Sequence, residues 1–198
     1  MPETVLHGRA DRPKIRHVRP RMEPSLLWTT FEERMRPSTY WLSIPAPWRL
    51  AIMPRPRTGD WLDDEIAGWK AEGINVLVSL LEPDEVAELD LHRLPMLCRG
   101  ADIEIVSFPI PDRGVPASIR ETDHLVRHLC DALAAGKAVA VHCRAGIGRS
   151  ALIAACVLVR SGHDVGAAFD IIAKARGVKV PDTQAQREWA SAFLAATV

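Results

Sequence analysis

The sequence predicts an α/β fold in which helices flank a central, mostly parallel sheet. Short apolar segments of strand length alternate along the chain with segments of helical periodicity, as in proteins built from parallel strands and crossover helices. The 198 residues, 47% of them hydrophobic, suit one domain with a buried core, with or without a tail. We therefore expect a single α/β domain.

The first 37 residues differ from the rest of the chain in charge. Between Arg9 and Arg21 there are six basic residues and one acid, a net charge of +5 without a periodic apolar face. We expect residues 1–37 to form a basic extension that is poorly ordered or loosely docked, and residues 38–198 to form one folded domain. Docking of the extension to an acidic partner or a nucleic acid is the functional alternative.

The elements of the domain follow in order from local signals. Residues 40–57 are rich in aromatic residues and proline, which is typical of short edge strands interrupted by proline. Asp60 is placed to cap a helix that Gly73 ends. The next strands are expected at 74–81, buried on both faces, and at 102–108.

The second half of the domain continues the alternation. Ser118 and Glu121 form a capping box ahead of an amphipathic helix. Residues 138–141 predict a short, wholly apolar strand, and residues 151–159 are apolar on all sides, as in a central buried helix. Two amphipathic helices follow, at about 164–175 and 183–195.

Composition excludes several classes of protein. Lys+Arg and Asp+Glu both number 25, which argues against a general polyanion-binding protein, and there is no strong nucleic-acid signal. Because there is no stretch of about 18 apolar residues and no apolar signal region, we expect neither a membrane span nor secretion. Four cysteines are too few for a disulfide scaffold, so we expect a cytoplasmic protein with reduced thiols. No Cys, His or carboxylate cluster has ligand spacing, so we expect no metal and no cofactor.

One segment carries a chemical signal. Between the apolar strand and the buried helix lies the run His142-Cys143-Arg144-Ala145-Gly146-Ile147-Gly148-Arg149-Ser150. A glycine-bearing turn ahead of a helix N-terminus directs backbone N–H groups into one concavity, a cradle of phosphate size. Arg149 can bind two phosphate oxygens at once through its planar guanidinium. The same field favours a thiolate at Cys143, beneath the phosphate and positioned for in-line attack on phosphorus.

This run resembles the active-site loop of the cysteine-dependent protein tyrosine phosphatase superfamily, whose signature is His-Cys-five residues-Arg-Ser/Thr. Residues 108–116 are similar to the general-acid loop of that superfamily, and residues 181–186 to its Pro-x-Thr-x-x-Gln segment. The resemblance covers residues 40–196 by layout and is greatest to the small atypical members of the dual-specificity branch. It implies a protein tyrosine phosphatase-like fold and makes residues 38–198 a phosphatase-like catalytic domain.

The resemblance also implies a role for each site residue. Cys143 would be the nucleophile and form a phosphocysteine, and Arg149 would bind the phosphate and stabilise the transition state. Ser150 would donate a hydrogen bond to the cysteine sulfur in the second step. Asp112 would protonate the leaving oxygen and later take a proton from water, although a turn aspartate is common in any protein. The phosphate would lie against Arg144, Ala145, Gly146, Ile147, Gly148 and Arg149.

Other residues would support this site. His142 would hydrogen-bond within the loop and help to fix the cysteine. Gln186 would position water or contact the loop, and the alternative is a surface glutamine on a helix. Glu82 either supports the site or is a plain surface charge. Arg144 and Arg113 add positive charge beside the pocket, or are ordinary solvated arginines.

The function that follows is phosphomonoester hydrolysis through a phosphocysteine intermediate, by a protein-tyrosine or dual-specificity phosphatase. The alternatives are the same chemistry on a phosphoinositide, another lipid phosphate or an RNA 5′ end, a phosphate-binding pseudophosphatase, and a rhodanese-like sulfurtransferase. The loop contains Arg144 but no lysine, which favours phosphoprotein over lipid. The expected partner is a phosphorylated protein or another phosphomonoester. Selectivity between phosphotyrosine and phosphoserine or phosphothreonine stays open, as does the oligomeric state.

Overall fold

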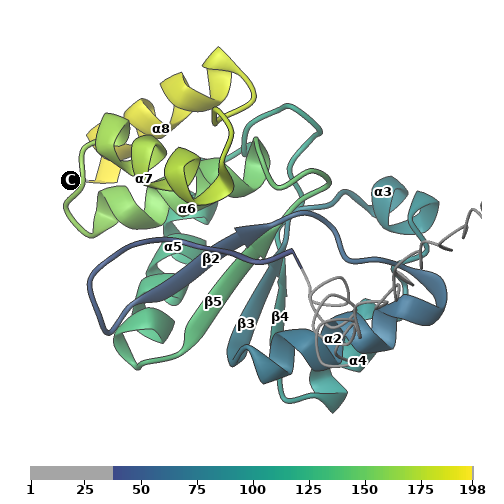
Figure 1. Cartoon of the computed structure of the whole chain (residues 1–198). Coiled ribbons are helices and arrows are strands. Elements are labelled where there is room, and N and C mark those ends of the chain that lie inside the picture. The colour runs from purple at the N-terminus through teal and green to yellow at the C-terminus, as the bar shows by residue number, and fades with distance from the viewer. Residues whose placement is uncertain (1–37, 198) are drawn as a thin grey trace, which may run out of the picture. The chain divides into compact units, whose positions relative to one another are not determined.

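The computed structural model describes residues 38–197, and the basic extension predicted for residues 1–37 lies outside the described residues. The centre is a five-stranded sheet with the order β1-β2-β5-β3-β4 (Figure 1). Neighbouring strands are parallel, except that β1 and β2 are antiparallel. The strands are β1 (Tyr40–Trp41), β2 (Arg49–Met53), β3 (Ile74–Ser79), β4 (Glu104–Ser107) and β5 (Ala138–His142).

Helices connect the strands and complete the chain. A 3-10 helix and α2 lie between β2 and β3, two short helices lie between β3 and β4, and α5 lies between β4 and β5. The helices are η1 (Gly59–Trp61), α2 (Leu62–Ala71), α3 (Pro83–Glu88), α4 (Leu94–Gly100), α5 (Ile119–Ala134), α6 (Arg149–Arg160), α7 (Val165–Arg176) and α8 (Gln184–Thr197).

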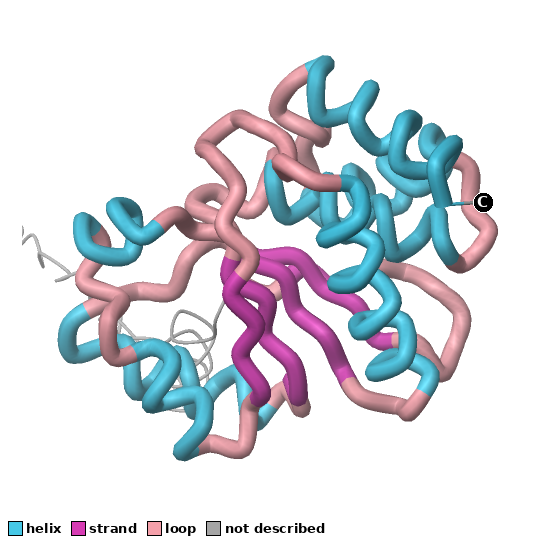
Figure 2. Tube along the Cα trace, turned by 180° about the vertical axis from the view of Figure 1, so that it is seen from behind, coloured by secondary structure: helices cyan, strands magenta, loops and turns pink. Residues whose placement is uncertain are grey.

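Helices cover both faces of the sheet (Figures 1 and 2). α5, α6, α7 and α8 bury the larger core against one face, and α2 and α4 bury a smaller core against the other. The strands serve both cores because successive side chains of a strand point to opposite faces. In β2, for example, Leu50 and Ile52 join the larger core, whereas Ala51 and Met53 join the smaller one.

β5 is the middle strand and leads directly into the segment that carries the chemical signal. All of its residues are buried, and it pairs in parallel with β2 on one side and with β3 on the other. A strand covered on both faces and paired on both edges needs the wholly apolar run of residues 138–141. α6 follows and is buried from Arg149 to Val159. The loop 143–148 therefore joins two of the most deeply buried elements in the described chain.

The predicted α/β fold with a mostly parallel sheet is confirmed, but the sequence was misleading about β2. It is an interior strand rather than an edge strand, because it pairs with both β1 and β5. The prolines that suggested an edge lie in the flanking loops and interrupt no ladder hydrogen bond.

The ends of several elements also differ from the prediction. Asp60 does not cap α2; it lies inside η1, and no side chain caps either helix. Ser118 caps α5 by accepting the Glu121 N–H at 3.2 Å, so the predicted capping box is realised through its serine. β3 and β4 are shorter than predicted, and the short helices α3 and α4 were not predicted.

The interior position of β2 leads to a test by mutation. Ile52→Ala is expected to lower the free energy of unfolding by about 2–5 kcal/mol, because it removes a fully buried side chain and leaves a cavity. Val178→Ala is the control, since Val178 is 44% exposed, and a change within about 0.5 kcal/mol is expected. Urea unfolding measures both, and equal effects of the two variants would contradict the interior placement.

Candidate active site

Cys143 opens the loop between β5 and α6. Its side chain is buried, and its Sγ accepts the N–H of Gly146 at 3.3 Å and lies 3.5 Å from the Ser150 hydroxyl oxygen. A hydroxyl can accept from a thiol or donate to a thiolate, so Ser150 can serve both protonation states of the sulfur. The sulfur is therefore surrounded by groups that can hydrogen-bond to a negative charge.

Two glycines allow the loop to take this shape. Gly146 has a φ of +67°, and a Cβ there would lie 2.7 Å from the backbone of Met53 and Pro54. A Cβ on Gly148 would lie 2.9 Å from the side chain of Asp182 and 3.0 Å from that of Gln186. The first glycine meets both a conformational and a steric requirement, and the second a steric one.

Arg149 begins α6 and is 2% exposed. Its Nη1 donates to the backbone oxygen of Ile110 at 3.0 Å and of Leu80 at 3.4 Å. Its two terminal nitrogens bind the carboxylate of Glu85 at 2.5 and 2.8 Å. Burial alone lowers the pKa of Arg149, but the bonds to Glu85 and the neighbouring negative charges raise it overall, so the guanidinium is always charged.

Glu85 on α3 is absent from the predicted site, yet it is nearly buried and holds Arg149 in place. It also accepts the Glu82 N–H at 3.0 Å and completes a capping box with Glu82. Burial raises the pKa of Glu85, but hydrogen bonds from Arg149 and Glu82 outweigh it and lower the pKa overall. The signal in the sequence was the capping pattern Glu82-Pro83-Asp84-Glu85, with proline at the first helical position. Glu82 supports the site indirectly, by starting the helix that carries Glu85.

Asp112 lies at the mouth of the site. Its Oδ1 is 2.9 Å from Arg149 Nη2, while its side chain remains 59% exposed. A tight turn presents it, since the Gly114 N–H donates to the Pro111 oxygen at 2.8 Å. The structure therefore brings the predicted acid and the predicted phosphate-binding arginine together.

Gln186 is fully buried and joins two loops. Its Nε2 donates to the Gly114 oxygen at 3.0 Å, on the loop of the predicted acid. Its Oε1 accepts the Thr183 N–H at 3.3 Å, and its own N–H donates to Thr183 Oγ1 at the same distance, which is a capping box at the start of α8. The Thr-x-x-Gln part of residues 181–186 thus starts α8 and ties it to the acid loop.

Arg176, at the end of α7, holds the loop from outside and was not predicted. Its Nε donates to the Gly146 oxygen at 3.0 Å and its Nη2 to the Ala145 oxygen at 3.3 Å. The guanidinium also stacks 4.2 Å over the ring of Tyr40. Arg176 binds these carbonyl oxygens outside the pocket. It therefore favours a loop conformation in which the loop N–H groups are available to bind an anion.

Two predicted residues lie differently from what the resemblance implied. Arg144 turns away to α3, where it binds the Glu88 carboxylate at 2.6 and 3.0 Å, so its charge is not directed into the pocket. His142 is fully buried; among the described residues its ring nitrogens make no hydrogen bond of standard geometry, but the ring interacts with the Cys143 backbone. Burial lowers the pKa of His142 to about 4, with the Cys143 backbone opposing this only in part, so the ring is neutral at pH 7.

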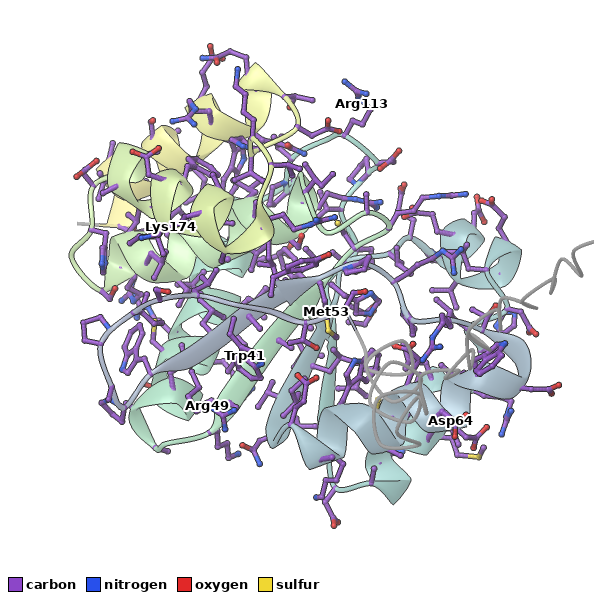
Figure 3. All side chains as sticks on the ribbon, viewed as in Figure 1. Trp41, Arg49, Met53, Asp64, Arg113 and Lys174 are labelled. Atoms are coloured by element: carbon purple, nitrogen blue, oxygen red, sulfur yellow. The ribbon has the colours of Figure 1, made fainter. Side chains whose placement is uncertain are left out.

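A cavity of about 90 Å³ lies between the loop after Cys143, the acid loop and the start of α8. Typical pockets for drug-sized ligands occupy roughly 300–1,000 Å³, so this one has room for a small anion and not for a whole substrate. Arg113 lies at its rim with its Nε 3.7 Å from Asp182 Oδ2, and Figure 3 shows it on the outermost loop of this region. The lining residues are Asp112, Arg113, Cys143, Ala145, Ile147, Gly148, Arg149, Asp182 and Gln186.

Three further findings concern the described part of the chain. Among residues 38–197, no group of three or more His, Cys, Asp or Glu side chains could hold a metal ion. Burial raises the pKa of the Cys98 thiol to about 12 and that of Cys130 to about 11, and raises that of Cys156 as well. In the same residues, no helix has the length and apolar character required to cross a membrane.

The Glu85–Arg149 pair leads to a prediction about stability and anion binding. Glu85→Gln is expected to lower the free energy of unfolding by roughly 2–4 kcal/mol and to weaken orthovanadate binding, because it leaves Arg149 buried without a counter-charge. The pKa of Glu85 is lowered in the folded state, so ionised Glu85 stabilises the wild type. This contribution to the free energy of unfolding is complete above about pH 4.3 and is lost as the pH falls further.

The control for this prediction is Glu88→Gln, which removes an exposed carboxylate from the same helix. Urea unfolding between pH 3 and 8 and vanadate titration compare the two variants. If Glu85→Gln and Glu88→Gln have the same free energy of unfolding and the same vanadate affinity at pH 7, Glu85 does not hold Arg149 as described.

The outer contacts of Arg176 lead to a prediction about the loop. Arg176→Gln is expected to weaken phosphate binding roughly tenfold, because two charge-assisted bonds to the loop carbonyls are lost. Lys174→Gln, an exposed change on the same helix, is expected to leave phosphate affinity unchanged. Calorimetric titration with inorganic phosphate measures both, and an unchanged affinity in Arg176→Gln would show that the loop holds its shape without it.

A family model covers the part of the chain that contains Asp112, Cys143 and Arg149. Residues 51–163, more than half of the chain, match the family Tc-R-P, described as "Polymorphic toxin system, DSP-PTPase phosphatase". Protein tyrosine phosphatase domain-containing protein 1 of Mus musculus is 36% identical over 96 residues. The match covers 44% of this chain but 13% of that protein, so the chain corresponds to a small part of this relative.

Solved structures show the same fold. A kinase-associated phosphatase with its catalytic cysteine replaced by serine has a TM-score of 0.74 at 23% identity, covering 82% of this chain and 98% of that one. Tk-PTP in its active form has a TM-score of 0.64 at 26% identity, covering 82% of this chain and 99% of that one. With the loop, fold and profile in agreement, the chain belongs to the Tc-R-P family of DSP-PTPase phosphatases and has the fold of the protein tyrosine phosphatases.

Proposed function

We propose that the chain hydrolyses phosphomonoesters through a phosphocysteine intermediate on Cys143, as a protein-tyrosine or dual-specificity phosphatase. One observation carries the proposal: Cys143 and Arg149 line the same small cavity, with Asp112 at its mouth. A sulfur nucleophile, a fixed guanidinium and an exposed carboxyl are the three groups that phosphoryl transfer through cysteine requires.

In the first step, the Cys143 thiolate attacks phosphorus and the bond from phosphorus to the leaving oxygen breaks. Asp112 gives its proton to that oxygen, while Arg149 and the loop N–H groups bind the phosphoryl oxygens. Asp112 Oδ1 lies 2.9 Å from Arg149 Nη2. We propose that the phosphate replaces Asp112 on the guanidinium, which leaves the carboxyl facing the leaving oxygen.

In the second step, water attacks the phosphocysteine and Asp112 takes a proton from it. The bond between phosphorus and sulfur breaks, and the thiolate leaves with a hydrogen bond from the Ser150 hydroxyl. The 3.5 Å separation between sulfur and hydroxyl supports this role. Gln186 keeps the acid loop beside the pocket through its bond to Gly114. His142, buried and neutral, is proposed to help fix the cysteine through its interaction with the Cys143 backbone.

A phosphoprotein is the proposed substrate. The cavity has room for little more than the phosphate, and no aromatic side chain is among its lining residues, so little of it is specific for a phosphotyrosine ring. The loop contains no lysine that would suit a multiply charged lipid headgroup. The alternative is the same chemistry on a phosphoinositide, since a structure of PTPMT1 in complex with PI(5)P shares the fold at 21% identity and a TM-score of 0.63.

We also propose that residues 38–198 form the catalytic domain and that it works in the cytoplasm. The described residues include both hydrophobic cores and every lining residue of the cavity, which supports this domain boundary. Thiols stay reduced most readily in the cytosol, which supports the location. The description of the family as part of polymorphic toxin systems makes such a system the setting in which to look for the substrate.

Phosphate release in excess EDTA tests the proposed function. The purified chain is expected to release phosphate from an aryl phosphate and from phosphotyrosine and phosphothreonine peptides, because no step needs a metal. Cys143→Ser is expected to abolish release, since the serine hydroxyl is a far weaker nucleophile than a thiolate. Asp112→Asn is expected to lower kcat by about 10²–10⁴, because the proton donor is lost.

A phosphoinositide and thiosulfate complete the set of substrates. Release from the phosphoinositide alone would move the function to lipid phosphates. Binding of orthovanadate without release from any substrate would indicate a pseudophosphatase, and sulfur transfer from thiosulfate would indicate a sulfurtransferase.

A further inference from the structure

Tyr40 is the only tyrosine of the chain and lies on β1, next to the arginine that holds the loop 143–148. Its ring is partly buried against the larger core, and the guanidinium carbon of Arg176 lies 4.2 Å from the ring centroid. A guanidinium at this distance is attracted by the negative face of an aromatic ring. This contact joins β1 to the end of α7, and neither step of the proposed reaction uses it.

The bonds from Arg176 set the direction of two peptide groups in the loop. Its Nη2 and Nε bind the Ala145 and Gly146 oxygens from outside the pocket. Both peptide bonds are trans, so the C=O of one residue and the N–H of the next point in opposite directions. An outward oxygen on Ala145 therefore turns the Gly146 N–H inward, where it donates to Cys143 Sγ at 3.3 Å. An outward oxygen on Gly146 turns the Ile147 N–H inward in the same way.

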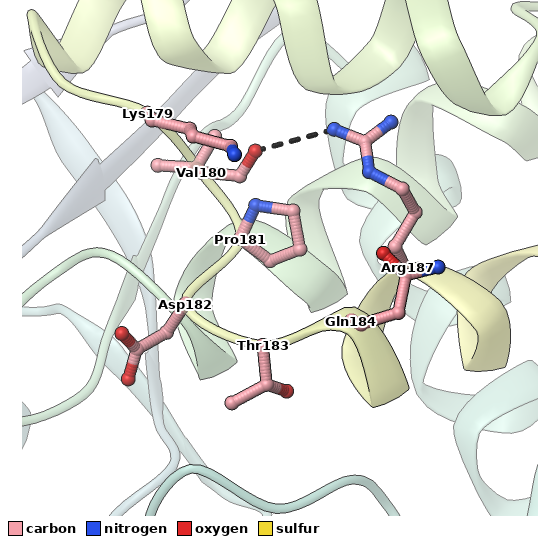
Figure 4. Close-up of a pocket in the computed structure, with 7 residues that line it drawn as sticks. All are labelled: Lys179, Val180, Pro181, Asp182, Thr183, Gln184 and Arg187. Atoms are coloured by element: carbon pink, nitrogen blue, oxygen red, sulfur yellow. Dashed lines mark hydrogen bonds between the residues drawn. The ribbon is translucent and has the colours of Figure 1, made fainter.

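The fold fixes the backbone of Arg176 but not its guanidinium. Gly177 ends α7 in the left-handed conformation, and the segment that follows is tied to α8 by the bond from Arg187 to the Val180 oxygen at 3.4 Å (Figure 4). A long side chain with several rotatable bonds can still take many positions on a fixed backbone. In the described part of the chain, Arg176 forms no ion pair with a carboxylate, so the Tyr40 ring is the contact that orients its guanidinium from outside.

The strand that carries Tyr40 is aligned with the same loop. β1 pairs with β2 so that Tyr40 lies opposite Ile52. The two residues after Ile52 form the backbone against which Gly146 packs, since a Cβ at Gly146 would lie 2.7 Å from Met53 and from Pro54. A tyrosine ring loses little conformational freedom when it is ordered, so it makes a rigid support. The ring, the end of β2 and the loop therefore have one arrangement.

We propose that Tyr40 is a positioning residue for the hydrolysis and acts through Arg176. The face of its ring keeps the guanidinium on the two loop oxygens, which keeps the inward N–H groups directed to the sulfur and the phosphate. This inference rests on the proposed function and deepens it, because it names a residue outside the pocket that prepares the loop before a substrate binds. The aromatic face is the required feature, and the hydroxyl is not.

Two substitutions of Tyr40 test the ring face. Tyr40→Leu keeps an apolar side chain without the aromatic face and is expected to weaken the binding of inorganic phosphate about twofold to fivefold, the range of a partly exposed cation–π contact. Tyr40→Phe keeps the face and is expected to bind phosphate with the wild-type affinity. Calorimetric titration measures both. The inference is wrong if Tyr40→Leu binds like the wild type, or if Tyr40→Phe loses as much affinity as Tyr40→Leu.

Trp41 provides a matched control on the same strand. Its ring lies against the smaller core, on the other face of the sheet, and the Arg49 guanidinium lies 4.6 Å over it. Figure 3 shows Trp41 and Arg49 together, well apart from Arg113 at the pocket rim. Trp41→Leu also removes an aromatic face from a guanidinium, so it is expected to lower the free energy of unfolding in urea but to keep the phosphate affinity. Equal losses of affinity in Trp41→Leu and Tyr40→Leu would show a general effect of β1 and overturn the inference.

Arg176→Gln shows whether Tyr40 acts through Arg176. In that background, Tyr40→Leu is expected to change the phosphate affinity by less than about twofold, because the group that the ring orients is gone. If the losses of affinity of the two single variants multiply in the double variant, the ring supports the loop by another route and the inference is wrong.

Hydrogen exchange of the loop amides in the absence of any anion separates this inference from the proposed function. Exchange of the Gly146 amide is expected to be faster in Tyr40→Leu than in the wild type, because local opening of the loop is easier, and unchanged in Tyr40→Phe. If the wild type hydrolyses no phosphate ester, the proposed function fails, and the exchange rates still decide about Tyr40. Equal exchange in Tyr40→Leu and the wild type would overturn the inference even where hydrolysis proceeds as proposed.

Discussion

The site depends on the buried ion pair between Arg149 and Glu85. Two charges out of water are stable only when each is well paired and its hydrogen-bonding groups are satisfied. Arg149 meets this condition with both carboxylate oxygens of Glu85 and with the backbone oxygens of Leu80 and Ile110. The pair connects α6, α3 and the segments that follow β3 and β4. The guanidinium is consequently held in the pocket before any phosphate binds, so little reorganisation is left for the reaction itself.

The two loops around this pair are positioned from outside the pocket. Arg176 binds the carbonyl oxygens of the loop after Cys143, and Gln186 binds the acid loop at Gly114. Both residues come from the α7–α8 region, which packs on α6 in the larger core. The packing of that core therefore affects the geometry of the pocket. In such a design, the reacting groups keep their place because surrounding side chains fix the backbone that carries them.

The contiguous part of the site could be predicted from sequence, and the assembled part could not. Cys143, Arg149 and Ser150 lie within eight residues of one another, so their relation is set by one turn between a strand and a helix. Glu85 is 64 positions from Arg149, and no local pattern links a capping residue on one helix to the first turn of another. Arg144 was expected beside the pocket, yet the carboxylate of Glu88 draws it to α3. A long side chain follows the nearest counter-charge, which only the fold reveals.

The sequence by itself determined the alternation of the strands with the longer helices, the wholly apolar character of β5 and the chemical character of the loop, because apolar runs, helical periodicity and glycine positions act over a few neighbouring residues. Only the tertiary structure decided that β2 lies inside the sheet. Its neighbours β1 and β5 are set by pairing between residues such as Leu50 and Val139, far apart in the chain. It likewise decided that a glutamate from α3 holds Arg149 and that an arginine from α7 holds the loop. Hydrogen bonds between distant segments depend on how the packed cores bring those segments together, and no local pattern in the sequence pairs their partners.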